Sequence, residues 1–222
     1  MCGRYLLTDF SEVLAERFEV ATLPGFNPPR YNVSPTQRMP VIVSNGTKRA
    51  ELMSWGLIPA WSREPKGFIN ARSETAATKP SFRKAFRTRR CIVPASGFFE
   101  WKETASGKLP YLLRVRGREL FGMAGLYDVW TGPDGPPISS YTILTCGPNG
   151  LTAPIHDRMP CILKPDAEAS WLMPENRDPA WLQRFLAPYP AEQMEAFPVS
   201  RAVNDPANDS PALIESVSAA AA

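Results

Sequence analysis

Cys2, the second residue of the chain, can supply two nucleophiles to one reaction. Its small side chain allows an aminopeptidase to remove Met1, which leaves a free α-amine beside a free thiol. Such an α-amine has a pKa near 7.7–8.0, so about a tenth of it is unprotonated at pH 7. It can attack an aldehyde to give a Schiff base, and the thiol can then close a five-membered thiazolidine ring. A hydrolase with a terminal nucleophile would use the same residue, and an accidental, buried Cys2 is the simplest alternative.

Two further residues are suited to moving protons. Glu100 lies among aromatic residues in the segment GFFEW (97–101), where burial would raise the pKa of its carboxyl group toward the range useful for proton transfer. His156 is the single histidine and lies in PIHDR (154–158), and a neutral imidazole suits proton transfer near pH 7. A surface carboxylate at a strand end and a structural histidine remain the alternatives to these two roles.

Polar and basic residues elsewhere could contact an anionic partner. Asn70 and Arg72 alternate along the chain, so in a strand both side chains lie on one face; a polar strand face alone would also explain them. Residues 79–90 (KPSFRKAFRTRR) carry six basic and no acidic side chains, a pattern that can follow a phosphate backbone or form a solvated helix face. The net charge of +3 permits nucleic-acid binding without requiring it.

Composition excludes several classes of protein. The 222 residues fit one large domain or two small ones, and the 24 prolines, spread along the chain, argue against an all-helical protein. No apolar run approaches the ~20 residues that a membrane helix needs, and the N-terminus lacks the apolar core of a signal peptide. We therefore expect no membrane partner, a cytoplasmic location, nucleoid-associated if the source is a bacterium, and reduced thiols.

The cysteines show no metal-binding pattern. Cys2, Cys91, Cys146 and Cys161 lack the two-to-four-residue spacing of a zinc knuckle, so we expect no metal. Cys91, Cys146 and Cys161 lie in apolar, strand-like runs and are expected to be small buried residues. Trp55 and Trp61 are expected to pack in the core or along a groove wall.

Hydrophobic periodicity and turn residues predict the helices and strands that must position these side chains. Residues 9–20 predict an amphipathic helix, residues 21–38 an irregular proline-rich segment, and Asn45-Gly46 the turn of a hairpin formed by 40–44 and 48–55. Short helices are predicted at 81–87, 166–173 and 178–187. Further strands are predicted at 91–95, 97–101, 110–116, 119–127, 140–146 and 160–163.

Many short strands with peripheral helices predict an α+β fold. We expect a single domain over residues 1–222, with a curved, barrel-like and mainly antiparallel β-sheet and short helices around it. The last residues, from about 216 to 222, end in four alanines and are expected to form a frayed tail.

Short blocks of sequence resemble one known family, SRAP (SOS response-associated peptidase), in matching order from residue 2 to about residue 215. The blocks are CGRY (2–5), RYNVSPTQ (30–37), SWGLIP (54–59), INARSE (69–74), CIVPASGFFEW (91–101), PIHDRMP (154–160) and VSRAVNDPAND (199–209). The resemblance implies the SRAP fold and a protein that crosslinks itself to abasic sites in single-stranded DNA. An abasic deoxyribose opens to an aldehyde, the electrophile that the Cys2 amine requires.

The resemblance also implies roles for individual residues. Cys2 would form the thiazolidine, Asn70 would position Cys2 and the opened sugar, and Glu100 and His156 would handle protons. Arg4, Arg72 and Arg158 would hold phosphates, while Pro35 and Trp101 would stack on bases beside the lesion. No metal or organic cofactor is needed, because the chain supplies the nucleophile and the acid–base groups. The expected protein is a monomer with lyase-like or hydrolase-like chemistry, and hydrolysis at the same site would reverse the crosslink.

Two other functions remain open at this stage. A thiol peptidase would use Cys2 as nucleophile and His156 as base, but it also needs oxyanion donors and a peptide groove. A non-catalytic single-strand binder would use the basic run and aromatic residues. The latter predicts that Cys2→Ala leaves every DNA-dependent property unchanged.

Overall fold

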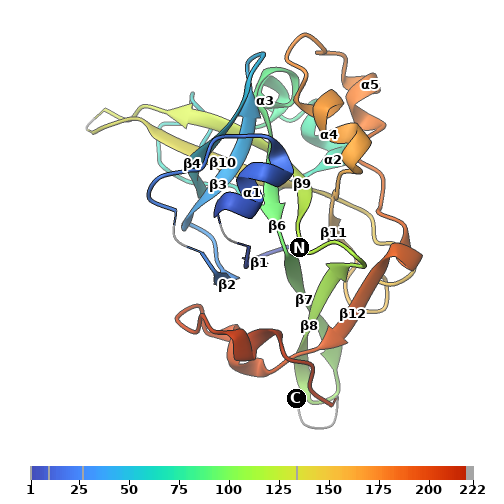
Figure 1. Ribbon diagram of the computed structural model, residues 1–222. Helices are drawn as coiled ribbons and strands as arrows, with labels where there is room; N and C mark the ends of the chain where they lie inside the picture. The colour runs from blue at the N-terminus through green and yellow to red at the C-terminus, as the bar shows by residue number, and fades with distance from the viewer. Residues whose placement is uncertain (1, 10, 27, 134, 219–222) are drawn as a thin grey trace.

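The computed structural model describes residues 2–9, 11–26, 28–133 and 135–218, and its strands form a closed barrel and a second, open sheet (Figure 1). The barrel order is β10-β4-β3-β6-β9, and β9 pairs back onto β10. The barrel strands are β3 (Arg38–Ser44), β4 (Lys48–Trp55), β6 (Arg90–Ala95), β9 (Phe121–Trp130) and β10 (Ile138–Cys146). Neighbouring strands are antiparallel except β10 and β4, which run parallel.

Two short strands extend the barrel at β10. β5 (Asn70–Arg72) pairs with it in parallel, and β11 (Met159–Pro160) pairs with it antiparallel. These two strands matter for the site, because the first carries Asn70 and Arg72 and the second directly follows the segment that carries His156.

The open sheet is antiparallel and has the order β12-β8-β7-β1-β2. Its strands are β1 (Arg4–Leu7), β2 (Arg30–Val33), β7 (Gly97–Thr104), β8 (Gly107–Val115) and β12 (Met194–Pro198). β6 of the barrel continues into β7 through Ser96, whose backbone N–H donates to Leu6 O at 2.8 Å. One continuous stretch of chain thus joins the two sheets.

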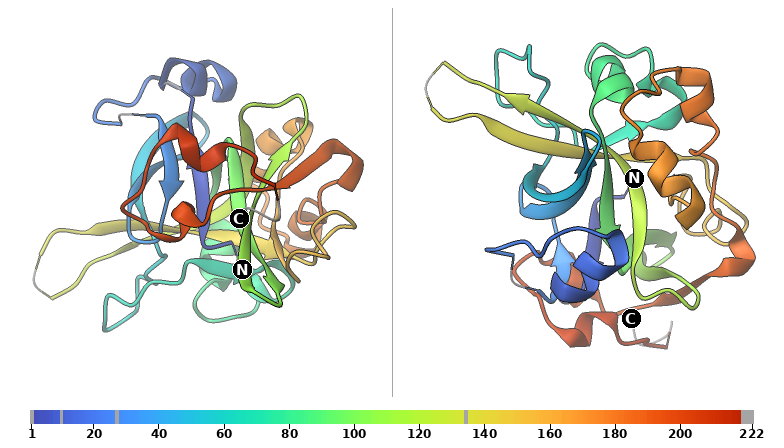
Figure 2. Two further views of the ribbon diagram at one scale, coloured as in Figure 1. Left: turned by 90° about the horizontal axis from the view of Figure 1, so that it is seen from below. Right: turned by 45° about the horizontal axis from the view of Figure 1, so that its top comes forward.

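The helices are short and lie outside the strands (Figures 1 and 2). They are α1 (Ser11–Phe18), α2 (Ser73–Ala76), α3 (Arg83–Thr88), α4 (Pro165–Leu172), α5 (Pro179–Gln183) and the 3₁₀ turns η1 (Ala191–Gln193), η2 (Arg201–Asn204) and η3 (Pro211–Ile214). Their starts follow the usual rules: Asp178 accepts from Ala180 N at 3.0 Å, and Pro179 and Pro165 occupy the first turns of α5 and α4.

An aromatic cluster fills the junction of the barrel and the open sheet. Tyr5 of β1 and Tyr141 of β10 share a hydrogen bond of 2.7 Å between their hydroxyl groups. Trp55 meets the edge of Tyr5 and stacks on Tyr141, with ring centroids 5.2 and 6.5 Å away. Trp55 is fully buried, as predicted, whereas Trp61 is 66% exposed and is not a core residue.

The outer face of the open sheet is covered by the C-terminal segment, residues 199–217 (Figure 2). Val199, Val203 and Leu213 of this segment pack on Leu6, Phe99 and Leu112. Asn32 of β2 holds the C-terminal segment in place. Its Nδ2 donates to the carbonyl oxygens of residues 203, 205 and 208 at 3.3, 3.0 and 2.7 Å. Its Oδ1 accepts from Arg4 at 2.6 Å.

Asn32→Ala is therefore expected to destabilise the protein by about 2–4 kcal/mol, since it leaves buried carbonyl groups and a guanidinium without their partner. The C-terminal segment should also become sensitive to proteases at low denaturant. Thermal melting and limited proteolysis measure the two effects. Asn45→Ala, in the exposed hairpin turn, is the matched control and should change the free energy of unfolding by less than about 0.5 kcal/mol. Equal behaviour of both variants would contradict this role.

The fold confirms the predicted class: an α+β domain with a barrel-like, mainly antiparallel sheet and peripheral short helices. The hairpin around Asn45-Gly46 is present as β3 and β4, and Gly46 has the positive φ of 108° that its turn requires. The helices predicted at 9–20 and 81–87 are present as α1 and α3; both are shorter than predicted, and α3 ends one residue later, at Thr88.

Other element predictions were wrong in part. The proline-rich segment 21–38 contains β2, because Arg30–Val33 pairs with β1. The strand predicted at 160–163 is limited to β11 and one bridge at Ile162, and the helix predicted at 178–187 ends at Gln183. Of the tail predicted at 216–222, Val217 still donates to Pro198 O at 3.0 Å, while 219–222 lie outside the described residues.

Candidate active site

Three residues predicted to carry chemistry meet at the junction of the two sheets. β1 pairs with β7 so that Arg4 lies opposite Phe99, and the chain running back from Arg4 to Cys2 therefore follows β7 toward Glu100. The Nε2 atom of His156 lies 3.8 Å from Oε2 of Glu100. Cys2, Glu100 and His156 come from three separate parts of the sequence, and strand pairing brings them together.

The thiol of Cys2 is held in its protonated form. The residue is fully buried, and its Sγ lies 3.9 Å from Arg4 O, to which it can donate. Burial raises the pKa of the Cys2 thiol, and the negative charge of Glu100 raises it further. This thiol is not an activated thiolate, so it needs a base or an already reactive electrophile.

Glu100 is a buried carboxyl group that can exchange protons at neutral pH. It lies in β7 opposite Tyr111 of β8, and only 2% of the residue is exposed. Burial raises its pKa to about 7. A carboxyl group with this pKa is present in both protonation states near neutral pH, as general acid–base catalysis requires.

His156 lies on a well-anchored loop, residues 147–158. Asn149 Oδ1 accepts from the backbone N–H groups of Leu151 and Thr152 at 3.0 and 2.9 Å, and Thr152 O accepts from His156 N at 2.9 Å. The backbone N–H of Arg158 donates to His156 Nδ1 at 3.0 Å. In the neutral ring the proton is therefore on Nε2, the atom that faces Glu100.

Burial lowers the pKa of His156, and the positive charge of Lys108 acts in the same direction, while the negative charge of Asp157 opposes both. The imidazole is thus neutral at pH 7. Together with Glu100 it forms a pair in which one member can donate a proton while the other accepts one.

Glu100 and His156 open into a cleft of about 330 Å³ that Trp101, Lys108 and Asn204 also line. Trp101 is half-buried, and its Nε1 donates to Asn204 Oδ1 at 2.7 Å, which fixes the plane of the indole ring. Pro35, the other predicted stacking residue, is half-buried in the turn after β2 and is not among the residues that line this cleft.

Asn70 begins β5, opposite Ile143 of β10. Its side-chain oxygen and nitrogen are buried and have no hydrogen-bond partner among the described residues. Buried amides are normally satisfied, so the side chain is available to a bound group.

The three predicted phosphate ligands differ in their present contacts. Arg72 is exposed at the end of β5. Arg4 donates to Asn32 Oδ1 and to Val203 O at 2.6 and 2.8 Å, and burial lowers its pKa. Arg158 forms a fork with Glu74 at 2.7 and 2.9 Å and also donates to Thr145 O at 2.5 Å.

The basic run 79–90 is divided between structure and surface. Arg90 is buried and donates to the carbonyl oxygens of residues 86, 87, 171 and 173, and Arg89 pairs with Asp128. Lys79, Arg83, Lys84 and Arg87 are exposed.

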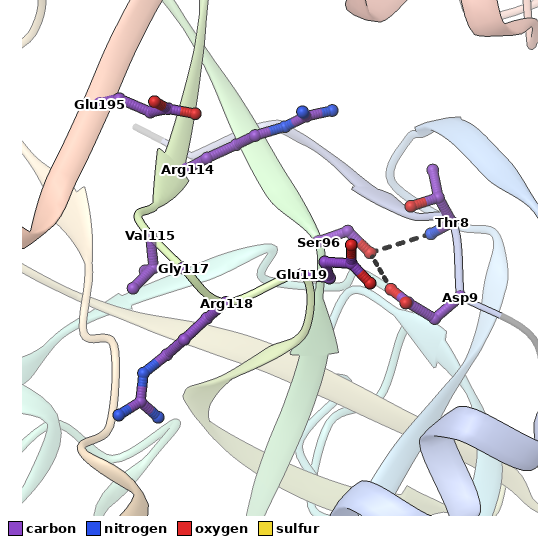
Figure 3. A pocket seen from close by; sticks show the side chains of 9 residues that line it. All are labelled: Thr8, Asp9, Ser96, Arg114, Val115, Gly117, Arg118, Glu119 and Glu195. Carbon is purple, nitrogen blue, oxygen red and sulfur yellow. Dashed lines mark hydrogen bonds between the residues drawn. The ribbon is translucent and has the colours of Figure 1, made fainter.

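A larger cavity, about 830 Å³, lies away from this cleft, where β7 begins and β8 ends (Figure 3). Ser96 donates to Asp9 at 2.7 Å and accepts from Thr8 N at 3.0 Å there, while Arg114 and Glu195 lie on the other side. Its lining has side chains of both charges and contains none of the predicted catalytic residues. The volume of a cavity therefore does not identify the candidate active site.

Sequence reasoning missed several residues that hold the site in place. Asn149 organises the His156 loop, Asn204 orients Trp101, and Glu74 pairs with Arg158. The segment INARSE ends at Glu74 and could have signalled it, but its partner lies 84 residues away.

The remaining cysteine and membrane predictions can be compared with the structure. Cys91, Cys146 and Cys161 are buried, as predicted. Among the described residues, no group of His, Cys, Asp and Glu side chains could hold a metal ion. None of the described helices has the length and apolar character needed to cross a membrane.

Comparison with known proteins identifies the family. The family model described as SOS response associated peptidase (SRAP) matches residues 1–206. The chain belongs to the SRAP family. Among its SRAP relatives, "Abasic site processing protein YoqW" from Bacillus subtilis (strain 168) is 46% identical over 224 residues, covering 97% of this chain and 100% of the relative.

Two proteins with lower identity show similar coverage. "Abasic site processing protein YedK" from Escherichia coli (strain K12) is 33% identical over 227 residues, covering 98% of this chain and 100% of the relative. A crystal structure of a protein from Bacteroides thetaiotaomicron superimposes with a TM-score of 0.89 at 30% identity, covering 97% of this chain and 100% of that one. The barrel and open sheet are thus the SRAP architecture.

Proposed function

We propose that this chain processes abasic sites in single-stranded DNA by forming a covalent thiazolidine with Cys2. The observation that carries the proposal is the position of Cys2, buried beside Glu100, whose pKa is about 7 and which lies 3.8 Å from His156. The names of relatives that match this chain over nearly its full length, abasic site processing proteins, support the same substrate. The reaction needs one chain, and we propose that a monomer performs it.

The reaction begins once Met1 has been removed. The carboxylate of Glu100 accepts the proton of the C1′ hydroxyl, the C1′–O4′ bond breaks, and the proton passes to the ring oxygen, which gives the open aldehyde. The free α-amine of Cys2 adds to the aldehyde carbon, and the resulting carbinolamine loses water to give an imine. The Cys2 sulfur then adds to the imine carbon while its proton passes to the nitrogen. The product has the mass of protein plus DNA minus one water.

Proton transfer is assigned to Glu100 and His156. Protonated Glu100 assists the departure of water from the carbinolamine, and neutral His156 exchanges protons with it through Nε2. The same groups, used in reverse, would hydrolyse the crosslink. The unsatisfied amide of Asn70 is assigned to the opened sugar and to Cys2, since its buried atoms need a polar partner.

The side chains around the cleft are assigned to the phosphates and bases of the DNA. Arg72 is exposed and suited to a phosphate. Arg4 and Arg158 would bind phosphates through the N–H groups that their protein partners leave available, since a guanidinium has five. Trp101, with its ring plane fixed by Asn204, would stack on a base, and Pro35 would cover the next one.

The thiol peptidase alternative receives less support from the site. A peptidase of this kind needs a thiolate activated by a neighbouring base. The pKa of the Cys2 thiol is raised, and His156 faces Glu100.

Intact mass spectrometry tests the proposal. The purified protein is incubated, without borohydride, with a single-stranded oligonucleotide that carries one abasic site. We expect an adduct at protein plus DNA minus one water, which survives denaturation and is absent with Cys2→Ala. The mass of the free protein shows whether Met1 has been removed. If a chain that begins at Cys2 forms no adduct, the proposal fails, and a peptidase or a simple single-strand binder becomes the better reading.

A further inference from the structure

An ion pair joins the two segments that flank the site. Glu74 lies in α2, which directly follows the strand that carries Asn70 and Arg72. Its two carboxylate oxygens accept hydrogen bonds from the two terminal nitrogens of Arg158, at 2.7 and 2.9 Å. The Arg158 guanidinium also donates to Thr145 O of β10 at 2.5 Å. These contacts hold Arg158, whose side chain is 14% exposed, against α2 and the barrel.

Arg158 contacts His156 through its backbone rather than its side chain. Its N–H donates to His156 Nδ1 at 3.0 Å, which occupies the lone pair of that nitrogen and leaves the proton of the neutral ring on Nε2. Nε2 is the atom that lies 3.8 Å from Glu100 Oε2. The position of the Arg158 backbone therefore decides which nitrogen presents a proton to Glu100.

A competing partner lies at the same atom. Asp157 Oδ1 is 3.0 Å from His156 Nδ1, a repulsive contact between two acceptors while the ring is neutral. If the Arg158 N–H moved away, Nδ1 could take a proton and pair with Asp157. Among the described residues, the other charged groups near the ring are Glu100 of β7, which faces Nε2, and Lys108 of β8.

We infer that Glu74 is a positioning residue: through its fork with Arg158 it keeps the Arg158 N–H on His156 Nδ1 and so keeps the His156 proton on Nε2. The consequence for the reaction rests on the function proposed above, but the position of the proton does not. Glu74 is not among the residues that line the cleft, and its effect acts through Arg158.

A purely structural role makes a different prediction. Glu74 is half-exposed, with 50% of its side chain accessible, and ion pairs of this kind contribute little to stability. A structural fork would therefore alter melting slightly and leave the imidazole unchanged. The positioning role predicts a change in the protonation of His156 in a protein that remains folded.

Nuclear magnetic resonance of His156 distinguishes the positioning role of Glu74 from a purely structural role. Because the chain has a single histidine, long-range ¹H–¹⁵N spectra of the imidazole need no assignment by mutagenesis. In the wild type at pH 7.5 we expect the Nε2–H tautomer. In Glu74→Gln we expect Nδ1 to become protonated, with the titration midpoint of His156 raised by about one pH unit, since Asp157 then stabilises the imidazolium. Glu74→Asp, which keeps the charge, should give an intermediate midpoint.

The control is Glu51→Gln, which removes a carboxylate, 35% exposed, that pairs with Arg49 on β4 and should leave His156 unchanged. If Glu74→Gln keeps the wild-type tautomer and midpoint, the inference is overturned. If Glu74→Gln does not fold, the same result with Glu74→Asp overturns it. In the crosslinking assay, Glu74→Gln should react about tenfold more slowly at saturating DNA. A wild-type protein that forms no crosslink would refute the proposed function and leave the NMR test valid.

Discussion

Cys2→Ser is expected to turn a stable crosslink into one that survives only after chemical reduction. Serine keeps the α-amine and is small enough for Met1 to be removed, so the amine can still form an imine with the aldehyde. The hydroxyl group is a much poorer nucleophile than the thiol and leaves the imine open to hydrolysis. We expect little adduct without borohydride and a clear adduct when borohydride is present from the start.

The same variant should cleave more DNA. An imine at the abasic carbon promotes β-elimination of the 3′ phosphate, and under the proposed mechanism the thiol of the wild type removes the imine before elimination occurs. Denaturing gels of an end-labelled oligonucleotide measure both products in one lane. Cys91→Ala is the control, because this thiol is buried in the barrel and its loss should change neither product. A Cys2→Ser protein whose adduct is as stable as the wild-type adduct, or whose strand scission does not rise, would refute the role of the thiol.

Local signals in the sequence predicted the local parts of the fold. The turn at Asn45-Gly46 forms the β3–β4 hairpin, where strand partners are adjacent in sequence. The periodic apolar residues of 9–20 form α1, with Leu14 and Phe18 buried. These elements are determined within a few residues, so their patterns are visible without knowledge of the fold.

Long-range pairing is what the sequence did not reveal. β2 lies in a proline-rich stretch with no strand pattern, and it becomes a strand because Val33 pairs with Tyr5 and because Asp209 accepts from the N–H groups of Tyr31 and Asn32. The partners of Arg4 and Arg158 are equally distant: Val203 and Glu74. A basic side chain in a motif predicts an anionic or polar partner, but the sequence does not say whether that partner is DNA or the protein itself.

The motifs singled out Cys2, Glu100 and His156 as candidates, and the structure shows what brings them together. The sequence placed Glu100 among aromatic residues, which correctly indicated burial and a raised pKa. It did not indicate that Glu100 would face His156, since 56 positions separate them and only the pairing of β1 with β7 and the loop after β10 bring the site together.

Glu100→Gln is expected to lower the rate of crosslinking at pH 7 by about 10²–10⁴-fold, the range over which general acid–base groups contribute. The carboxyl group has a pKa of about 7, so in the wild type its carboxylate form is lost as the pH falls from 7 to 5, and the rate should fall with it. In the variant the α-amine, with a pKa near 7.7–8.0, and His156 still titrate, but the carboxyl group does not, and the rate should depend less steeply on pH. Single-turnover assays on denaturing gels measure the crosslinking rate and its dependence on pH. Glu103→Gln, an exposed residue of the same strand, should behave as wild type.

The wild type should be more active than Glu100→Gln but should lose more stability as the pH rises. The folded-state pKa of Glu100 is raised from 4.5 to about 7, so between these values the folded protein retains a proton that the unfolded chain has released. Stability from the neutral carboxyl group is fully present below pH 4.5 and is lost as the pH rises through 7, by about 3 kcal/mol at most. Glutamine cannot ionise, so Glu100→Gln should lose less stability than the wild type between pH 5 and 8, as measured by denaturant unfolding. If both proteins lose the same amount, Glu100 does not carry a raised pKa, and its role as the neutral-pH acid and base would have to be abandoned. A less active variant that resists alkaline pH better would show that the buried carboxyl group is retained for chemistry at the expense of stability.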